Sequence, residues 1–318
     1  MNSIVFLNSS RVDFDNKLDF SQLKELGKVT LYENSSEGQI LDRVTDQNIV
    51  ITKELSIGRE LIKKFPSSVK LICEAGTGYN NIDIEACRER NIRVCNVPGY
   101  SSEAVAQLVI TFMLSLSSSM HRQQRMLTNK NYDNFTKFLQ VPHFEVQNKT
   151  LGVIGAGAIG KQVMKIAVVL GMKILVYSRT PKDLGSAAIK FTSLEELLKE
   201  SDFVTIHCPL TEKTKYLIDE SKLHLMKPNA FIINTSRGAI IKEQDLIEAL
   251  KNKVIAGAAL DVQEIEPPKL TNPLYSMENV ILTPHIGWKG YETRQRLINL
   301  LGENIEAYIS GRGVNFIV

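Results

Sequence analysis

One ten-residue stretch, from Leu151 to Gly160, constrains the fold of this chain more than any other. It reads Leu-Gly-Val-Ile-Gly-Ala-Gly-Ala-Ile-Gly, so a short apolar run leads directly into the spacing Gly-x-Gly-x-x-Gly. The residues that follow, up to Leu170, have the apolar spacing of a helix. A strand that turns through three glycines into a helix is the start of a parallel βαβ unit. The stretch therefore predicts an α/β domain with a parallel sheet.

Strands and helices are expected to alternate on both sides of this stretch, as is typical of parallel α/β units. The first hundred residues contain five candidate strands, at 4–7, 29–32, 49–52, 69–73 and 92–95, with helical stretches such as 18–26 and 82–90. Six more candidate strands lie at 151–154, 174–177, 203–207, 230–234, 255–261 and 280–283, with helices at 159–170, 194–199, 243–251 and 291–310. We predict an α/β fold with two doubly wound, Rossmann-like parallel sheets.

The length of 318 residues also favours two domains, because it is long for a single hydrophobic core. The last helix is expected to return to the first domain, which is then discontinuous (1–100 and 288–318) around a second domain at 101–287. A cleft between the two domains would be the expected active site.

A long apolar segment that begins near Ser102 links the two sets of strands. Its length and its Ser, Thr and Gln residues favour a buried helix over a membrane span, which needs about 20 apolar residues. Residues 121–147 are polar and poorly periodic. We expect them to form either a solvated loop or an arm that packs on a partner subunit.

Composition narrows the class of protein. A net charge of +3 is too small to indicate binding to nucleic acid or to a membrane. The four cysteines form no Cys-x-x-Cys pair, and Cys73 and Cys95 lie in apolar runs, which favours a reducing, cytoplasmic location. No spacing indicates a metal site, and no Gly-x-Ser-x-Gly motif or Cys–His arrangement indicates hydrolysis.

The three glycines of the turn are those that dinucleotide binding requires. Gly155 permits a tight turn, Gly157 lets the backbone approach a pyrophosphate, and Gly160 allows close packing of the helix on the strand. The helix N-terminus then offers free N–H groups and a positive dipole end to the phosphates. The alternative is a glycine turn without a ligand.

The end of the next strand predicts which dinucleotide is bound. NAD-binding domains place an acidic residue there to receive the ribose 2′-hydroxyl, whereas this chain has Ser178-Arg179-Thr180. All three side chains can donate hydrogen bonds to a 2′-phosphate, and arginine adds charge. We predict a preference for NADP(H). The alternative is a solvated Arg179 and an enzyme that also accepts NAD(H).

Three side chains that could perform chemistry follow three successive strands of the second domain: Arg237, Glu266 and His285. Ligands of open α/β sheets bind beyond the carboxyl ends of the strands, so these groups are expected to meet beside the cofactor. Reduction of a 2-keto acid needs a cation for the carboxylate, which Arg237 can provide, and a proton for the carbonyl oxygen, which His285 can deliver. Glu266 would orient the imidazole ring and favour its protonated form.

Each residue also has a structural alternative, as a surface ion pair, a loop residue or a structural histidine. The joint placement favours the catalytic interpretation. Asp261, at the end of the candidate strand 255–261, could accept the nicotinamide carboxamide N–H or could cap a turn. No catalytic role is assigned to the remaining histidines, which are His121, His143, His207 and His224.

At this point the motifs match a family. The chain resembles the D-isomer-specific 2-hydroxyacid dehydrogenases over essentially its whole length, through the stretches 74–83, 96–107, 155–160, 207–211, 234–238, 259–262, 266–267 and 283–287. The resemblance implies a substrate domain with a flavodoxin-like sheet (1–100 and 288–318), a cofactor domain (101–287), and a homodimer formed through the helix and arm at 102–147.

The resemblance also implies roles for individual residues. It identifies Arg237, Glu266 and His285 with the catalytic triad. Substrate contacts are implied for Gly76, Thr77, Gly78, Arg237, His285 and Trp288, with backbone N–H groups of the glycine-rich loop on the substrate carboxylate. Cofactor contacts are implied for Gly155, Gly157, Ala158, Ile159, Gly160, Ser178, Arg179, Thr180, Cys208, Pro209, Thr214, Thr235, Ser236, Arg237, Asp261, His285 and Gly287.

Local features narrow the expected substrate. The chain is similar to glycerate dehydrogenases, also called hydroxypyruvate reductases, in the stretch Ile286-Gly287-Trp288 and in the Glu292, Arg294 and Arg296 that follow it. At Ser178 it is similar to the NADPH-using glyoxylate and hydroxypyruvate reductases. Formate dehydrogenases of the superfamily carry Gln where this chain has Glu266, and the regulatory domain of many phosphoglycerate dehydrogenases is not expected after Val318. We predict reduction of hydroxypyruvate or glyoxylate. The alternatives are a D-lactate or other D-2-hydroxyacid dehydrogenase and, from another class, a dinucleotide-sensing protein similar to the C-terminal-binding corepressors.

Overall fold

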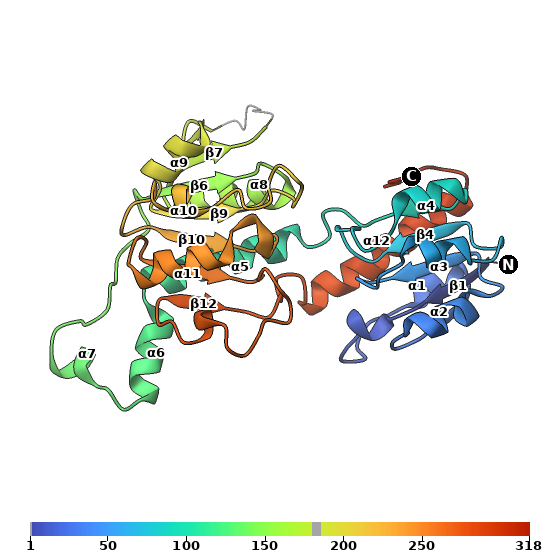
Figure 1. Cartoon of the computed structure of the whole chain (residues 1–318), viewed down its shortest axis with the longest axis horizontal. Helices are drawn as coiled ribbons and strands as arrows, with labels where there is room; N and C mark the ends of the chain where they lie inside the picture. The colour runs from blue at the N-terminus through green and yellow to red at the C-terminus, as the bar shows by residue number, and fades with distance from the viewer. Residues whose placement is uncertain (1, 180–185) are drawn as a thin grey trace. The chain divides into compact units, whose positions relative to one another are not determined.

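A computed structural model describes residues 2–179 and 186–318 of the chain. Thr180, one of the predicted cofactor contacts, lies outside the described residues. The chain divides into two compact units (Figure 1). Unit 1 comprises the residues up to Ser101 together with Trp288–Val318, and unit 2 comprises Ser102–Gly287.

Unit 1 is built on a parallel sheet of five strands in the order β2-β1-β3-β4-β5. The strands are β1 (Asn2–Phe6), β2 (Gly27–Leu31), β3 (Ile49–Thr52), β4 (Leu71–Glu74) and β5 (Arg93–Cys95). This is the flavodoxin-like order. Successive side chains of a strand point to opposite faces, so Ile4 and Phe6 lie in one buried cluster and Val5 lies in another.

Helices cover both faces of this sheet. They are α1 (Ser21–Glu25), α2 (Glu37–Val44), α3 (Arg59–Lys63), α4 (Ile84–Glu89) and α12 (Tyr291–Ile309), with a short 3-10 turn at Ser9–Arg11. α12 contributes Leu297, Leu301 and Ile305, spaced four residues apart, to the cluster that contains Ile4 and Phe6. This apolar stripe brings the end of the chain back to the first sheet, so unit 1 is discontinuous.

Unit 2 contains a parallel sheet of seven strands in the order β12-β11-β10-β9-β6-β7-β8. Its strands are β6 (Thr150–Ile154), β7 (Lys173–Tyr177), β8 (Ile189–Phe191), β9 (Phe203–Ile206), β10 (Phe231–Asn234), β11 (Gly257–Leu260) and β12 (Val280–Leu282). This is the Rossmann order with one further strand, and the predicted fold class is confirmed. The strand β8 is not among the predicted strands, because three residues are too few to reveal a period.

The helices of unit 2 cover both faces of its sheet (Figure 1). They are α5 (Ser102–Ser117), α8 (Ala158–Val169), α9 (Leu194–Glu200), α10 (Glu220–Leu223) and α11 (Glu243–Lys251), with 3-10 turns at Gly238–Ile240 (η2) and Pro273–Tyr275 (η3). α5 and α8 share one buried cluster with Leu151 and Val153 of β6. α9, α10 and α11 contribute to the cluster on the other face.

The segment 121–147 is more regular than predicted. It contains most of α6 (Met120–Thr128) and all of α7 (Asp133–Thr136), which extend away from the sheet of unit 2 (Figure 1). Neither helix buries a side chain, so neither needs the apolar periodicity that sequence analysis looks for.

Within residues 2–179 and 186–318, no single helix is long and apolar enough to cross a bilayer. The helices α5 and α6 together reach that length and composition, with a bend of 62° between them.

Candidate active site

The glycine turn of unit 2 is tightly packed at two of its three glycines. Gly155 has φ +106°, and a Cβ there would lie 2.8 Å from the backbone nitrogen of Cys208. A Cβ at Gly160 would lie 2.2 Å from the carbonyl oxygen of Gly155, so a side chain would push α8 off the turn. Both positions therefore require glycine for the fold of the turn itself.

Gly157 is different, because no protein atom lies within 4 Å of the position that its Cβ would take. It is the N-cap of α8, and no side chain caps the free N–H groups there. Open space beside an uncapped helix N-terminus fits a pyrophosphate, whose charge the helix dipole stabilises. The backbone of Ala158 and Ile159, the first two residues of α8, follows directly after Gly157 at this helix N-terminus.

Beyond β7, Ser178 is half-buried and Arg179 is exposed. Burial raises the pKa of the Cys208 thiol to about 11, and the positive charge of Arg179 opposes this shift. The guanidinium therefore lies near the loop after β9. The structure thus brings the ends of β7 and β9 together beside the glycine turn.

The loops after β9 and β10 are joined by hydrogen bonds. The hydroxyl of Ser236 donates to the carbonyl of Cys208 (2.6 Å). Thr214 closes the first loop, since its hydroxyl donates to the carbonyl of Pro209 (2.6 Å) and accepts the N–H of Thr211 (2.7 Å). Thr235 is 8% exposed, and its hydroxyl has no hydrogen-bond partner in the described structure.

Asn234, at the end of β10, shapes the turn that carries Arg237. Its side-chain amide donates to the carbonyl of Arg237 (2.9 Å), and its oxygen accepts the N–H of Ser236 (3.0 Å). The guanidinium of the exposed Arg237 donates to the carbonyl of Ser236 (2.8 Å). Asn234 is not among the predicted site residues, although an Asn at the end of an apolar strand is a signal for a side chain that organises a turn.

His285 and Glu266 are in direct contact. Nδ1 of His285 lies 2.9 Å from Oε2 of Glu266, and the other oxygen of Glu266 accepts the N–H of Gln263 (2.9 Å). The side chains are 27% and 37% exposed, so solvent reaches both. Partial burial raises the pKa of Glu266, but the hydrogen bonds from His285 and Gln263 and the charges of His285 and Arg237 outweigh it and hold the pKa below its ordinary value.

Asp261 holds the turn from which His285 projects. Its carboxylate, 2% exposed, accepts hydrogen bonds from the hydroxyl of Thr283 (2.6 Å) and from the N–H groups of Ile286 (2.8 Å) and Gly287 (2.9 Å). The N–H of His285 also donates to the backbone carbonyl of Asp261 (2.9 Å). These contacts stabilise the left-handed conformation of His285, whose φ is 52°.

The remaining histidines have other environments. Burial lowers the pKa of His207 to about 3, so its ring is neutral, and it contacts the hydroxyl of Thr205 (2.9 Å). His121 and His224 contact backbone carbonyls, and His143 is exposed. Within residues 2–179 and 186–318, no group of three or more His, Cys, Asp or Glu side chains is arranged to hold a metal ion.

In unit 1, the loop Gly76–Gly78 follows β4 and is anchored by its carbonyls and its hydroxyl. The N–H of Val97 donates to the carbonyl of Gly76 (2.9 Å), and the side chain of Asn96 donates to that of Thr77 (2.7 Å). The hydroxyl of Thr77 donates to the carbonyl of Val97 (3.1 Å). These contacts tie the loop to the residues that follow β5.

The buried side chain of Lys53 lies beside this loop and is not among the predicted site residues. The ammonium of Lys53, 3% exposed, lies 4.2 Å from the ring centre of Trp288 and 3.1 Å from where a Cβ of Gly76 would lie. It pairs with Glu54 (2.7 Å). Burial raises the pKa of the nearby Glu74 to about 7 despite hydrogen bonds and the charge of Lys53. A lysine directly after an apolar strand was the available signal.

Comparison with known proteins agrees with this geometry. The model of the D-isomer specific 2-hydroxyacid dehydrogenase, NAD binding domain, matches residues 110–287. A hydroxypyruvate reductase of Blautia hydrogenotrophica is 34% identical over 307 residues, which are 94% of this chain and 95% of that protein. A glyoxylate reductase of Thermococcus litoralis is 38% identical over 280 residues, 86% of this chain and 84% of that protein.

A solved structure shares the whole fold. An acyclic imino acid reductase, solved in complex with NADPH and D-Arg, has a TM-score of 0.87 and 30% sequence identity, and the match covers 99% of this chain and 100% of that chain. The glycine turn, the α8 N-terminus and the matching family model together indicate an oxidoreductase with a nicotinamide dinucleotide cofactor, which supplies or accepts a hydride when bound. The chain belongs to the D-isomer-specific 2-hydroxyacid dehydrogenases, a family that acts on small 2-hydroxy acids.

Proposed function

We propose that this protein reduces a small 2-keto acid, hydroxypyruvate or glyoxylate, to the 2-hydroxy acid with NADPH. The observation that carries the proposal is the contact between His285 and Glu266, in the same unit as Arg237 and the glycine turn. The names of the relatives, hydroxypyruvate reductase and glyoxylate reductase, support this choice of substrates.

The proposed roles follow from the chemistry of each group. Reduction adds a hydride to the carbonyl carbon and a proton to the carbonyl oxygen, and His285 donates that proton. Glu266 accepts a hydrogen bond from Nδ1 of His285, which orients the ring with Nε2 toward the substrate oxygen. Arg237 binds the substrate carboxylate and polarises the carbonyl.

Substrate contacts in unit 1 are proposed for the N–H groups of Gly76, Thr77 and Gly78, and for Trp288. The anchored carbonyls of this loop support its role as a donor of N–H groups to a carboxylate. The buried ammonium of Lys53 adds positive charge next to it. Asp261, which already accepts three hydrogen bonds, is proposed to accept the carboxamide of the cofactor as a further donor.

The preference for NADPH is proposed from the end of β7. Ser178 and Arg179 stand where NAD-specific domains place an acidic residue, which would repel a 2′-phosphate, and Arg179 is exposed. The acyclic imino acid reductase solved with NADPH supports this cofactor.

A homodimer is also proposed, formed through the arm that comprises α6, α7 and the residues up to 147. This arm carries side chains that a monomer would leave in water: Phe135 is 77% exposed, Phe138 94% and Leu139 51%. Clustered exposed aromatic and aliphatic side chains are typical of interaction surfaces. A second copy of the chain is the partner that the family resemblance implies.

Turnover of a panel of 2-keto acids with NADPH and NADH tests the function. We expect glyoxylate or hydroxypyruvate to give the highest kcat/KM. We expect kcat/KM to be about tenfold or more higher with NADPH than with NADH, because NADH lacks the 2′-phosphate and so loses one or two charge-assisted hydrogen bonds.

Arg179→Ala should reduce kcat/KM with NADPH and leave kcat/KM with NADH nearly unchanged. Tight NADPH binding without turnover of any panel member would favour a dinucleotide sensor instead.

A further inference from the structure

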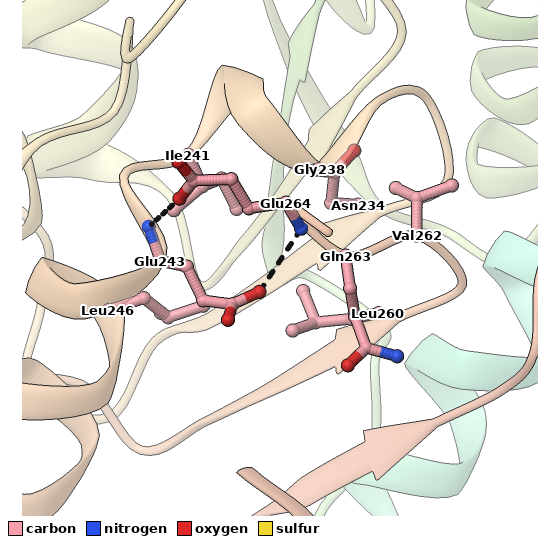
Figure 2. Close-up of a pocket in the computed structure, with 9 residues that line it drawn as sticks. All are labelled: Asn234, Gly238, Ile241, Glu243, Leu246, Leu260, Val262, Gln263 and Glu264. Carbon is pink, nitrogen blue, oxygen red and sulfur yellow. Dashed lines mark hydrogen bonds between the residues drawn. The ribbon is translucent and has the colours of Figure 1, made fainter. Parts of the chain in front are cut away.

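A small cavity lies behind the loops that carry Arg237 and Glu266. It is lined by residues of the segments 234–246 and 260–264 (Figure 2). None of the three proposed catalytic side chains lines it. The residues that line it connect the loop that carries Arg237 with the loop that carries Glu266.

The two loops are in backbone contact at Gly238. A Cβ there would lie 2.0 Å from the carbonyl carbon of Gln263 and 2.4 Å from the nitrogen of Glu264. The loop that follows Arg237 therefore runs directly over the peptide that precedes Glu266, and only a glycine permits this approach.

Two glutamates stabilise this contact through a pair of reciprocal hydrogen bonds, drawn as dashed lines in Figure 2. The carboxylate of Glu264 accepts the N–H of Glu243 (3.2 Å), and the carboxylate of Glu243 accepts the N–H of Glu264 (3.1 Å). We call this pair the glutamate clasp. Each carboxylate has a second donor: the hydroxyl of Tyr216 donates to Glu264 (2.5 Å) and the amide of Asn272 donates to Glu243 (2.8 Å).

Tyr216 also ties the clasp to the loop of Arg237. Its N–H donates to the carbonyl of Ala239 (2.8 Å), so one residue holds both the 3-10 turn after Arg237 and the Glu264 carboxylate. On the other side, the N–H of Gln263, next to Glu264, donates to Oε1 of Glu266. A continuous set of contacts therefore runs from the Arg237 loop to the carboxylate that holds His285.

We propose that Glu243 and Glu264 are positioning residues of the reaction: their reciprocal hydrogen bonds hold the Arg237 loop and the Glu266 loop in the register that the catalytic groups require. The inference rests on the proposed function. Neither glutamate contacts substrate, and both act through Gln263 and Glu266. Misplacement of catalytic groups by about 1 Å costs up to about 100-fold in rate, so the clasp affects turnover more than cofactor binding.

The test compares substitutions of Glu264 that differ in reach and in hydrogen bonding. Glu264→Ala should lower kcat by about 10- to 100-fold with the Kd for NADPH unchanged. Glu264→Gln should restore most of the rate, because its carbonyl oxygen accepts the N–H of Glu243 and the Tyr216 hydroxyl can turn to accept from its NH2. Glu264→Asp keeps the charge but is one methylene too short, so it should be as slow as the alanine variant.

The pH profile separates a positioning role from a merely structural one. In Glu264→Ala, the N–H of Gln263 is no longer held against Glu266, so one of the hydrogen bonds that lower the pKa of Glu266 is weakened. The charges of His285 and Arg237, which also lower this pKa, do not change. The acid limb of kcat/KM should therefore move to higher pH in Glu264→Ala and stay at its wild-type position in Glu264→Gln. Asp245→Ala is the matched control, because Asp245 lies in the first turn of the same helix, α11, and its carboxylate accepts a different backbone N–H, that of Glu220 (2.9 Å).

Amide hydrogen exchange measures the clasp without turnover. The N–H of Glu264 should exchange faster in Glu243→Ala than in the wild type or in Asp245→Ala. Faster exchange in Glu243→Ala, together with a wild-type kcat and pH profile in Glu264→Ala and Glu264→Asp, would overturn the positioning role. Unchanged exchange in Glu243→Ala would overturn the glutamate clasp itself. A wild-type protein that reduces no 2-keto acid would instead contradict the proposed function and leave the exchange result to be judged separately.

Discussion

His285 and Glu266 are 19 residues apart in the chain, and their side chains meet because the loops after β11 and β12 leave neighbouring strands at the same edge of the sheet. The left-handed φ of His285 aims its ring back toward Glu266, and Asp261 keeps the turn in that conformation. The nearby charge of Arg237 helps to keep Glu266 ionised. In the proposed site, the proton donor His285 is held by the Glu266 carboxylate, which the charge of Arg237 stabilises.

Removal of the imidazole should separate chemistry from binding. His285→Ala is expected to lower kcat by about 10²- to 10⁴-fold, the usual contribution of a general acid, while the Kd for NADPH changes little. Steady-state kinetics and a fluorescence titration with NADPH measure the two quantities. His224→Ala is the control, because His224 is exposed and contacts only a backbone carbonyl of its own helix. Near-normal turnover of His285→Ala would remove this residue from the mechanism.

The strand–turn–helix element β6–α8 assigns different tasks to glycines that look alike in the sequence. Gly160 lies against the carbonyl of Gly155, whereas Gly157 faces open space at an uncapped helix N-terminus. The first is needed for packing of α8 on the turn, and the second leaves room for a ligand. The motif therefore combines a requirement of the fold with a requirement of binding.

Alanine substitution should distinguish these two tasks. Gly160→Ala is expected to destabilise the protein by about 1–3 kcal/mol, because its Cβ meets backbone that cannot turn away. Gly157→Ala should leave the free energy of unfolding almost unchanged but raise the Kd for NADPH by about tenfold or more, because the methyl group occupies the space that a phosphate needs.

Denaturant unfolding with and without NADPH measures both effects. Gly38→Ala, in α2 of unit 1, is the control for a glycine with no atom within 4 Å of its Cβ position and should not alter NADPH binding. Wild-type affinity for NADPH in Gly157→Ala would contradict the assignment of this turn to the phosphates.

Across the whole molecule, two parallel sheets of different strand order are each covered by helices on both faces, and unit 2 also carries an extended arm. The helices of this arm, α6 and α7, bury none of their own side chains. The exposed aromatic side chains of the arm therefore need another surface to cover them. The proposed homodimer supplies that surface.

Charge introduced into the arm should therefore disrupt the dimer without unfolding the chain. Phe138→Asp, alone or with Leu139→Asp, is expected to shift the sedimentation coefficient from that of a dimer to that of a monomer, because a buried carboxylate without a partner opposes association. Tyr275→Asp is the control, since Tyr275 is also 51% exposed but lies outside the arm. A dimer that survives in the arm variants, or a wild-type protein that is monomeric at all concentrations, would contradict this role of the arm.

The parallel sheets, the glycine turn and the types of residue at three strand ends could be predicted from the sequence, because each of these leaves a period or a spacing along the chain. Which groups share hydrogen bonds depends on the tertiary structure. Glu243 begins α11 and Glu264 lies 21 residues further on in a loop, with no periodic spacing that links the two. Lys53 reaches Trp288 only through the return of the end of the chain. Such contacts depend on how loops approach in space, and a one-dimensional pattern does not record that approach.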